Sequence, residues 1–282
     1  MRLKEIPRGE ERSAEQLIEH YELEKELAGK LKKSTKEKRK KFYKILYDEL
    51  FQKIPHHPQL ARKADAEKQR KANSWQLNIL SDFFFPHKTF MELGPGDCSL
   101  SFELCNYFKK VYAIDVSRKI TKNSQKPTNF ELIISDGSNV NMPPGSIDVA
   151  YSNQLMEHLH PDDAIEQVQG IYKALVSGGV YICLTPHRFM GPHDISKYFD
   201  DVATGFHLKE YSNTELYRLF KSVGFRKIHS YKWIKGIGLN IPIYPAIMAE
   251  CLISPLPHSV RKKISRKLLI RHLLGISLIA TK

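Results

Sequence analysis

Cysteine is scarce in this sequence, which has four in 282 residues, at positions 98, 105, 183 and 251. Their spacing does not match a zinc site, and two of them fall inside predicted strands or helices. The neighbours His56 and His57 have no third ligand close in sequence, and on an extended chain they would point to opposite sides. We therefore expect reduced, buried thiols and no metal ion.

Long apolar segments are also missing. The longest stretch without a charged residue, 236–249, is too short to cross a bilayer and contains two prolines. The first residues, MRLKE, are charged and begin no apolar segment, which argues against a cleaved signal peptide. These absences predict a cytoplasmic protein without a transmembrane helix.

Acidic residues are nearly absent from two parts of a chain whose formal net charge is +13. Residues 30–44 hold nine basic residues and one acid, and no acid follows Glu250. Such basic segments suit the phosphates of nucleic acid, lipid head groups or a nucleotide-linked substrate. A solvated helix face that aids solubility explains 30–44 and 261–271 equally well.

The most informative stretch that is present is 90–98, FMELGPGDC, which predicts a strand, a tight turn and a helix over about 99–108. Gly94 and Gly96 allow the backbone to turn sharply and to approach a ligand without an intervening Cβ. Alone, the pattern is equally typical of an ordinary strand-to-helix turn. The residues that follow decide between these interpretations.

Four further predicted strands end in polar residues. They cover 111–114, 130–134, 147–151 and 180–184, and lead into Asp115, Asp136-Gly137, Ser152-Asn153 and Thr185. Because the carboxyl ends of parallel strands meet at one edge of an open sheet, these side chains predict a ligand site. Asp115 is spaced from the glycine turn as a ribose-binding carboxylate would be.

These ordered segments resemble the class I S-adenosylmethionine (SAM)-dependent methyltransferases, in particular their small-molecule, type 11-like branch. The stretch 92–97 (ELGPGD) is similar to the family's first motif, 135–137 (SDG) to its adenine-contacting turn, and 148–159, ending in EHL, to its fourth motif. The likeness covers about 75–230. It implies an α/β fold with a Rossmann-like, seven-stranded, doubly wound sheet whose seventh strand is antiparallel.

The resemblance also implies SAM as cofactor, with S-adenosylhomocysteine as product, and a set of cofactor-binding residues. Asp115 corresponds to the ribose-binding acid, and the others are Glu92, Gly94, Gly96, Asp97, Val116, Asp136, Gly137 and Asn153. Cys98 stands at the family's third glycine position. An NAD dehydrogenase is disfavoured, because its Gly-x-Gly-x-x-Gly motif would need glycine where the chain has Ser99.

Both ends of the chain add to the predicted methyltransferase domain, 75–282. The extension 1–74 predicts three helices: 13–31 with a capping box at Ser13 and Gln16, one from Ser34 with Glu37 as its capping partner, and one over about 61–84. In the resembled family such helices often cross the cofactor cleft, so they predict either a lid or a structural cap. An insertion at about 235–271 separates the sixth strand, 225–233, from the seventh, 273–281. Its apolar and basic parts suit either peripheral membrane contact or packing against the domain.

Methyl transfer from a sulfonium is an in-line displacement that needs an aligned acceptor and no covalent enzyme residue. As base or acceptor-orienting group we nominate His193 in the long loop after the fifth strand, supported by Asp194 or His207. His158, which follows the fourth strand, is expected near the transferred methyl. Alternatively, His158 braces the next helix and Asp194 caps a helix start.

We expect a SAM-dependent methyltransferase that acts on an O or N nucleophile of a small-molecule, glycan or lipid-linked acceptor. The first alternative is RNA ribose methylation with the basic segments as docking surface, although no aromatic ladder accompanies the lysines. Methylation of a base amine is disfavoured, because residues 152–155 read SNQL and not the Asn-Pro-Pro-Tyr motif. The second alternative is a non-catalytic binding module on the same fold, against which the acids at 92, 115 and 136 argue.

Overall fold

The sheet is the framework on which every later feature depends. In the computed structural model, which describes residues 3–4, 6, 8–60, 66–117, 126–234 and 237–282, it has eight strands. In spatial order these are β3 (Phe130–Ile134), β2 (Lys110–Asp115), β1 (Thr89–Leu93), β4 (Ile147–Asn153), β5 (Leu175–Thr185), β8 (Ile276–Thr281), β6 (Lys227–Ile234) and β7 (Ile237–Pro242). Neighbouring strands from β3 to β5 are parallel, and β8 runs antiparallel between β5 and β6.

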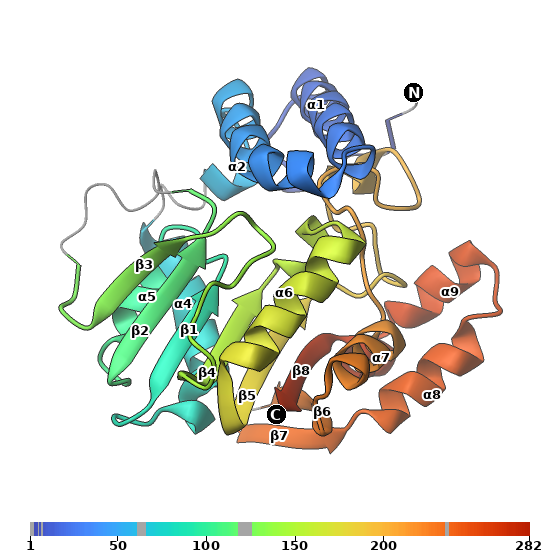
Figure 1. Cartoon of the computed structure of the whole chain (residues 1–282). Helices are drawn as coiled ribbons and strands as arrows, with labels where there is room; N and C mark the ends of the chain where they lie inside the picture. The colour runs from blue at the N-terminus through green and yellow to red at the C-terminus, as the bar shows by residue number, and fades with distance from the viewer. Residues whose placement is uncertain (1–2, 5, 7, 61–65, 118–125, 235–236) are drawn as a thin grey trace.

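Helices cover both faces of this sheet (Figure 1). One face carries α4 (Ala66–Leu80) and α5 (Ser99–Leu104), and the other carries α6 (Pro161–Ala174) and α7 (Asn213–Val223). Side chains of the central strand β1 alternate between the two cores, with Phe90 in the first and Met91 in the second. Because both faces are covered, these parallel strands are mostly apolar in their middle positions.

The predicted fold class is confirmed, and the sheet has one strand more than the seven predicted. The predicted seventh strand is β8, beside β6 as expected. The extra strand is β7, where the start of the predicted insertion pairs antiparallel with the outer edge of β6. Pro242 ends this edge strand, a position at which a missing N–H is tolerated.

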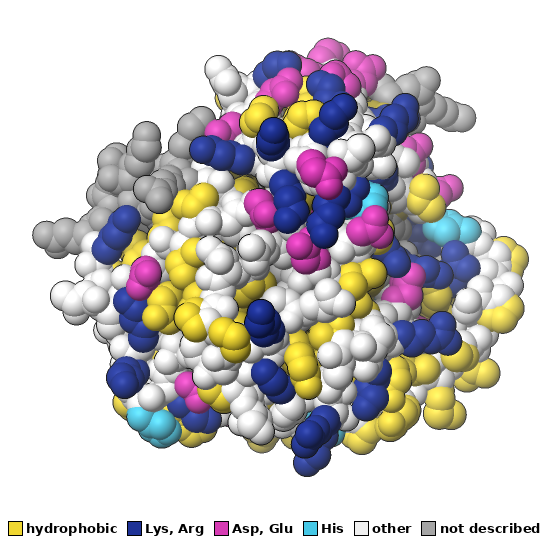
Figure 2. Space-filling model, viewed as in Figure 1, with side chains coloured by type: hydrophobic (Ala, Val, Ile, Leu, Met, Phe, Trp, Pro, Cys, Tyr) yellow, Lys and Arg dark blue, Asp and Glu magenta, His cyan; other side chains and the backbone are white. Residues whose placement is uncertain are grey.

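The rest of the insertion forms α8 (Tyr244–Ile253), α9 (His258–Ser265) and α10 (Leu268–Leu274). The buried carboxylate of Glu250 anchors α8: it accepts from His187 Nε2 at 2.7 Å and from the backbone N–H groups of Asn213 and Thr214 at 2.6 and 2.9 Å. This carboxylate therefore also caps α7. In Figure 2, hydrophobic side chains gather over α8 and α9 with Lys and Arg side chains among them. Among the described helices, none is both long and apolar enough to cross a membrane.

The two N-terminal helices, α1 (Ala14–Lys32) and α2 (Lys36–Lys53), lie above the carboxyl ends of the parallel strands (Figure 1). The predicted capping box at Ser13 and Gln16 is present in α1. The box predicted at Ser34 is wrong: α2 begins after Thr35, and the Ser34 hydroxyl donates to the last turn of α1, at Lys30 O. The described part of the third helix is α4, because the predicted start at 61 lies outside the described residues.

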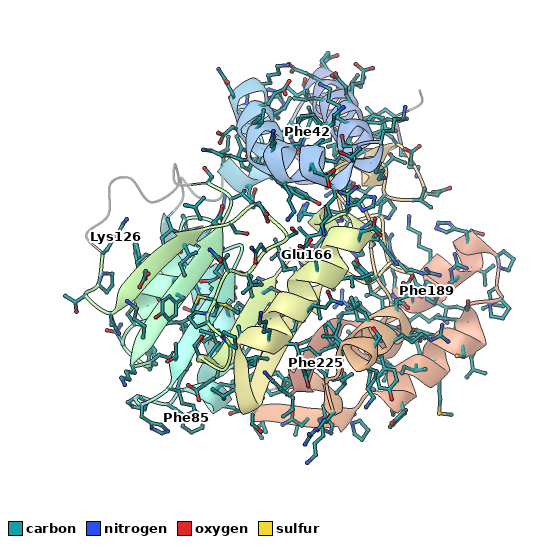
Figure 3. The ribbon with its side chains drawn as sticks, in the orientation of Figure 1. Phe42, Phe85, Lys126, Glu166, Phe189 and Phe225 are labelled. Carbon is teal, nitrogen blue, oxygen red and sulfur yellow. The ribbon has the colours of Figure 1, made fainter. Side chains whose placement is uncertain are left out.

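A buried ion pair ties α2 to α6. Arg39 of α2 donates from Nε and Nη2 to the two carboxylate oxygens of Asp163, at 2.7 and 2.8 Å. Tyr43 donates its hydroxyl hydrogen to Asp163 at 2.7 Å and accepts from the His160 N–H at 2.9 Å. Glu166, directly below α2 in Figure 3, adds a more exposed pair with Lys36 at 2.9 Å. Helix α2 is therefore attached to the start of α6 by charge-assisted hydrogen bonds.

Candidate functional site

A cavity of about 660 Å³ opens where β1, β2 and β4 end. Gly94 and Gly96 form part of its wall after β1, and Asp115 forms another part at the end of β2. Tyr47 and Phe51 of α2 line the opposite side, so α2 is the roof of the cavity. The site therefore combines a backbone turn, a carboxylate and an aromatic cover.

The turn after β1 requires left-handed backbone at three positions. The φ angles are 66° at Gly94, 62° at Gly96 and 61° at Cys98. At Gly94 a Cβ would also lie 3.1 Å from Leu155 Cδ1. Cys98 is the residue that pays a steric cost, since a side chain in this conformation is unfavourable. Its buried thiol joins the apolar core beside α5, so the turn keeps its shape without the third glycine.

Carboxylates surround the glycine turn. Glu92 is buried and accepts a hydrogen bond from the Ser101 hydroxyl. Burial, together with the nearby charges of Asp97 and Asp115, raises the pKa of Glu92 to about 7, and the Ser101 hydrogen bond opposes this shift. A cationic ligand in the cavity would lower this pKa and be stabilised by the same acids. The electrostatics therefore favour a positively charged ligand over a pyrophosphate.

Six of the nine residues nominated for cofactor binding line the cavity, namely Gly94, Gly96, Asp97, Asp115, Val116 and Gly137. The other three do not. Glu92 is buried behind the turn, and Asn153 donates to Gln76 at 3.1 Å. The Asp136 carboxylate accepts from the backbone N–H groups of 138 and 139 and pairs with Lys40 of α2 at 3.0 Å. Asp136 thus shapes the turn that presents Gly137.

Of the nominated catalytic residues, His158 alone lines this cavity. Its Nδ1–H donates to the Phe206 carbonyl at 3.0 Å. Burial, together with the neighbouring His207, lowers the pKa of His158 to about 3, so the ring is neutral. The His207 ring centroid lies 4.9 Å away, and its Nδ1 bonds to Glu210 at 2.8 Å. His207 lines a second cavity of about 300 Å³, whose cationic side chains are Arg188, Lys209 and Arg261.

His193 and Asp194 are arranged around the same loop but line neither of these cavities. The His193 ring lies against Glu210, with Nδ1 3.3 Å from Oε1. Asp194 caps the short 3₁₀ helix Ile195–Tyr198 by accepting from Ser196 N–H at 3.0 Å, and also accepts from the N–H groups of 205 and 207. The capping interpretation of Asp194 therefore matches the structure better than a direct role at the cavity.

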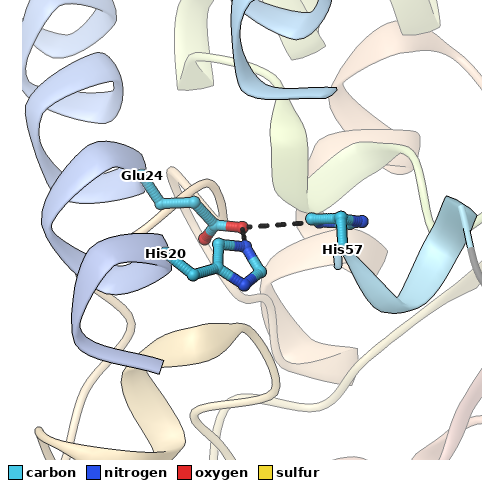
Figure 4. A group of neighbouring side chains, drawn as sticks. All are labelled: His20, Glu24 and His57. Carbon is cyan, nitrogen blue, oxygen red and sulfur yellow. Dashed lines mark hydrogen bonds and ion pairs between the residues drawn. The ribbon is translucent and has the colours of Figure 1, made fainter. Parts of the chain in front are cut away.

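A cluster that the sequence analysis did not predict joins His20 and Glu24 of α1 to His57 (Figure 4). Glu24 Oε1 lies 2.8 Å from His20 Nε2 and 3.8 Å from His57 Nε2, and Glu24 and His57 line the cavity. Arg12 donates to His20 Nδ1 at 2.9 Å, so the ring hydrogen of neutral His20 sits on Nε2 and points at Glu24. Glu24 Oε2 also accepts from Phe206 N–H, which joins α1 to the loop below. This cluster is a hydrogen-bond network that attaches α1 to the loop that contains Phe206.

Residues 91–183 match a family model described as a methyltransferase domain. A chain from the Haloferax volcanii complex of the Trm112 methyltransferase activator shares the fold with a TM-score of 0.54, at 13% identity over 78% of this chain and 96% of that one. A SAM-dependent methyltransferase from Archaeoglobus fulgidus gives 0.50, at 19% identity over 76% and 94%. Phosphoethanolamine N-methyltransferase 1 of Haemonchus contortus also gives 0.50, at 18% identity over 65% of this chain but 40% of that one.

No curated protein matches the sequence of this chain. At these identities the structural likenesses show a shared fold and carry no information on the acceptor.

Proposed function

We propose that this chain, whose residues 91–183 match a methyltransferase-domain model, uses SAM to methylate an O or N nucleophile of a small acceptor. The observation that carries this proposal is that Gly94, Asp115 and His158 face one cavity beneath α2. In this assignment 75–282 is the catalytic domain with its insertion, and 1–74 is a helical extension that covers the site. The acceptor class extends to a glycan or a lipid-linked molecule.

We assign the cofactor to the strand ends of the cavity. Asp115 would accept hydrogen bonds from the ribose hydroxyls, and the turn at Gly137 would contact the adenine. The acids around the glycine turn would stabilise the cationic donor. His158 lines the same cavity and would be available to an acceptor bound beside the cofactor.

The chain's contribution to the reaction is alignment and exclusion of water. In-line displacement needs the nucleophile opposite the sulfur, and the aromatic side chains of Tyr47 and Phe51 that line the cavity would help to exclude water from it. Neutral His158 keeps its Nδ1 hydrogen on the Phe206 carbonyl, so its Nε2 lone pair is free to accept a hydrogen bond from the acceptor. No covalent intermediate with the protein is involved.

The RNA alternative is weakened by the partners of the basic segment 30–44. Lys30, Lys36, Arg39 and Lys40 already pair with carboxylates of the protein. Arg39 is also buried, so it is removed from any docking surface. Each cation neutralised within the protein contributes less to binding a phosphate backbone.

The acceptor class is tested by supplying isotopically methyl-labelled SAM to the purified protein with separate small-molecule, lipid and RNA fractions of cell extract. We expect label in the small-molecule or lipid fraction, in amounts that scale with enzyme. Label confined to RNA would establish the alternative, and SAM binding without transfer to any fraction would support a non-catalytic module.

We further propose that the insertion 235–271 contacts an anionic membrane surface. Leu252 and Leu269 expose 76% and 82% of their surface, next to a segment rich in Arg and Lys without any acid. Apolar side chains beside cations are typical of proteins that lie on a lipid interface.

Replacing Leu252 and Leu269 together by serine is expected to weaken sedimentation with phosphatidylglycerol-containing vesicles by about 10-fold, since two exposed apolar side chains are lost. Val202, exposed at 62% outside the insertion, supplies the matched control as Val202→Ser. Equal sedimentation of wild type with neutral phosphatidylcholine vesicles, or no sedimentation with either, would contradict the proposal.

A further inference from the structure

We propose that Glu157, His158 and His207 together bind one divalent transition-metal ion of the zinc type. One ligand atom of each residue lies within 4.8 Å of those of the other two. His158 lines the large cavity and His207 the second one, so the ion would sit between the two. The sequence predicted no metal, because 49 positions separate His158 from His207 and the fold alone brings them together.

The hydrogen bonds of the two histidines prepare them as ligands. His158 Nδ1 donates to the Phe206 carbonyl, which can only accept, and His207 Nδ1 donates to the Glu210 carboxylate. When neutral, each ring therefore carries its hydrogen on Nδ1 and leaves the Nε2 lone pair available. Metal-bound histidines commonly donate their other N–H to a carbonyl or carboxylate in this way. Among the described residues, nothing forms a hydrogen bond with either Nε2.

Glu157 supplies an independent indication. Its side chain is fully buried, and Oε2 accepts from the Thr185 hydroxyl at 2.8 Å, but Oε1 has no hydrogen-bond partner among the described residues. A buried carboxylate oxygen without a partner is unfavourable, and burial accordingly raises the pKa of Glu157. A bound cation would compensate this oxygen directly.

The cluster at His20, Glu24 and His57 is less suited to bind a metal ion. There Arg12 occupies His20 Nδ1, so the ring hydrogen lies on the nitrogen that would have to bind the metal. Its carboxylate is also satisfied, since Glu24 accepts from His20 and from Phe206 N–H. We therefore assign the ion to the cluster at Glu157 alone.

Two imidazoles and one carboxylate are ligands that suit zinc, cobalt and related ions. Zinc bonds of 2.0 to 2.2 Å put ligand atoms about 3.4 Å apart, so modest side-chain rotation closes the present triangle. Three protein ligands leave a fourth position for water. If the proposed methyl transfer is correct, an oxygen of the acceptor can occupy that position, which would replace its hydrogen bond to His158 Nε2, and the ion would lower the pKa of a hydroxyl acceptor.

The test uses untagged, full-length protein stripped with EDTA, titrated with Zn²⁺ or Co²⁺ alone. We expect about one equivalent bound, with visible Co²⁺ absorption typical of a four- or five-coordinate site. Loss of an outer-shell partner weakens metal binding 10- to 100-fold, so Glu157→Gln and His207→Ala should each weaken it by more than about 100-fold. His57→Ala and His193→Ala, which alter the neighbouring histidines, should keep full stoichiometry.

Circular dichroism on the same samples shows that each variant is folded, and SAM binding by calorimetry separates this inference from the proposed function. Metal-free wild type that binds SAM but takes up neither ion at micromolar concentration would overturn the metal site and leave the methyltransferase assignment intact. Metal uptake that is lost in His57→Ala and kept in Glu157→Gln would overturn it as well. One equivalent of metal in a protein that does not bind SAM would support the site and refute the proposed function.

Discussion

Gly94→Asp is expected to abolish saturable SAM binding, with at least a 100-fold loss of affinity, about 2.7 kcal/mol. The backbone at Gly94 has φ 66°, where a side chain is strained by about 1 to 3 kcal/mol. Its Cβ would lie 3.1 Å from Leu155 Cδ1, and the added carboxylate would enter the cavity wall. Strain and lost space both act on the proposed cofactor surface. Calorimetric titration with SAM measures the loss.

Gly145→Asp is the matched control for this experiment. Gly145 has almost the same backbone conformation, φ 63°, and a Cβ there would meet no atom within 4 Å. Gly145 does not line the cavity, so backbone strain is reproduced without disturbing the site. SAM affinity of the control should stay within a few-fold of wild type. Equal losses in the two variants, or wild-type binding by Gly94→Asp, would argue against the assigned site.

Asp163→Ala is expected to lower the free energy of unfolding by about 3 to 5 kcal/mol, as measured by urea denaturation. Asp163 is fully buried and accepts from both Arg39 and Tyr43. Removing it leaves a buried guanidinium and a buried hydroxyl without their acceptor. Because these groups belong to α2, the roof should loosen and SAM affinity should fall with stability.

Glu166→Ala provides the comparison on the same pair of helices. Its ion pair with Lys36 also joins α2 to α6, but the side chains are 32% and 47% exposed. Exposed pairs contribute between 0 and about 1 kcal/mol, so this variant should unfold at nearly the wild-type urea concentration. The double variant Arg39→Met, Asp163→Leu replaces the buried charges with apolar groups and should recover much of the lost stability. A small effect of Asp163→Ala would show that α2 is held by apolar packing instead.

The central sheet was predictable because each buried strand is apolar and is followed by a turn or a polar residue. Gly224, a residue type that favours helix C-caps, ends α7 with a φ of 118°. The strand β7 could not be predicted, because it depends on the free edge of β6 and not on a pattern of its own. The start of α2 was mispredicted for a local reason. Ser34 and Thr35 are both good N-cap residues, but the Ser34 hydroxyl bonds to the last turn of α1, and Thr35 is the N-cap of α2.

The strand-end part of the site was predictable from the glycine turn and Asp115, and the resemblance suggested helices above it, but the contacts that hold these helices in place were not predictable. Glu24 reaches Phe206 N–H across 182 positions, and no periodicity in the sequence encodes such a contact. The cluster at Glu157 was unpredictable for the same reason, because His207 lies on a different segment from Glu157 and His158. Long-range packing, rather than local propensity, decides which histidine meets which carboxylate.

The hydrogen bonds of Tyr43 have a consequence for turnover. Tyr43 accepts from His160 N–H and donates to Asp163, so helix α2 is fastened to the short segment that also carries His158. The cover of the cavity and the segment that carries His158 are therefore joined through one tyrosine hydroxyl. Lifting α2 away from the cavity would break the hydrogen bonds of Tyr43 to His160 and Asp163, so access to the cavity from this side has an energetic cost.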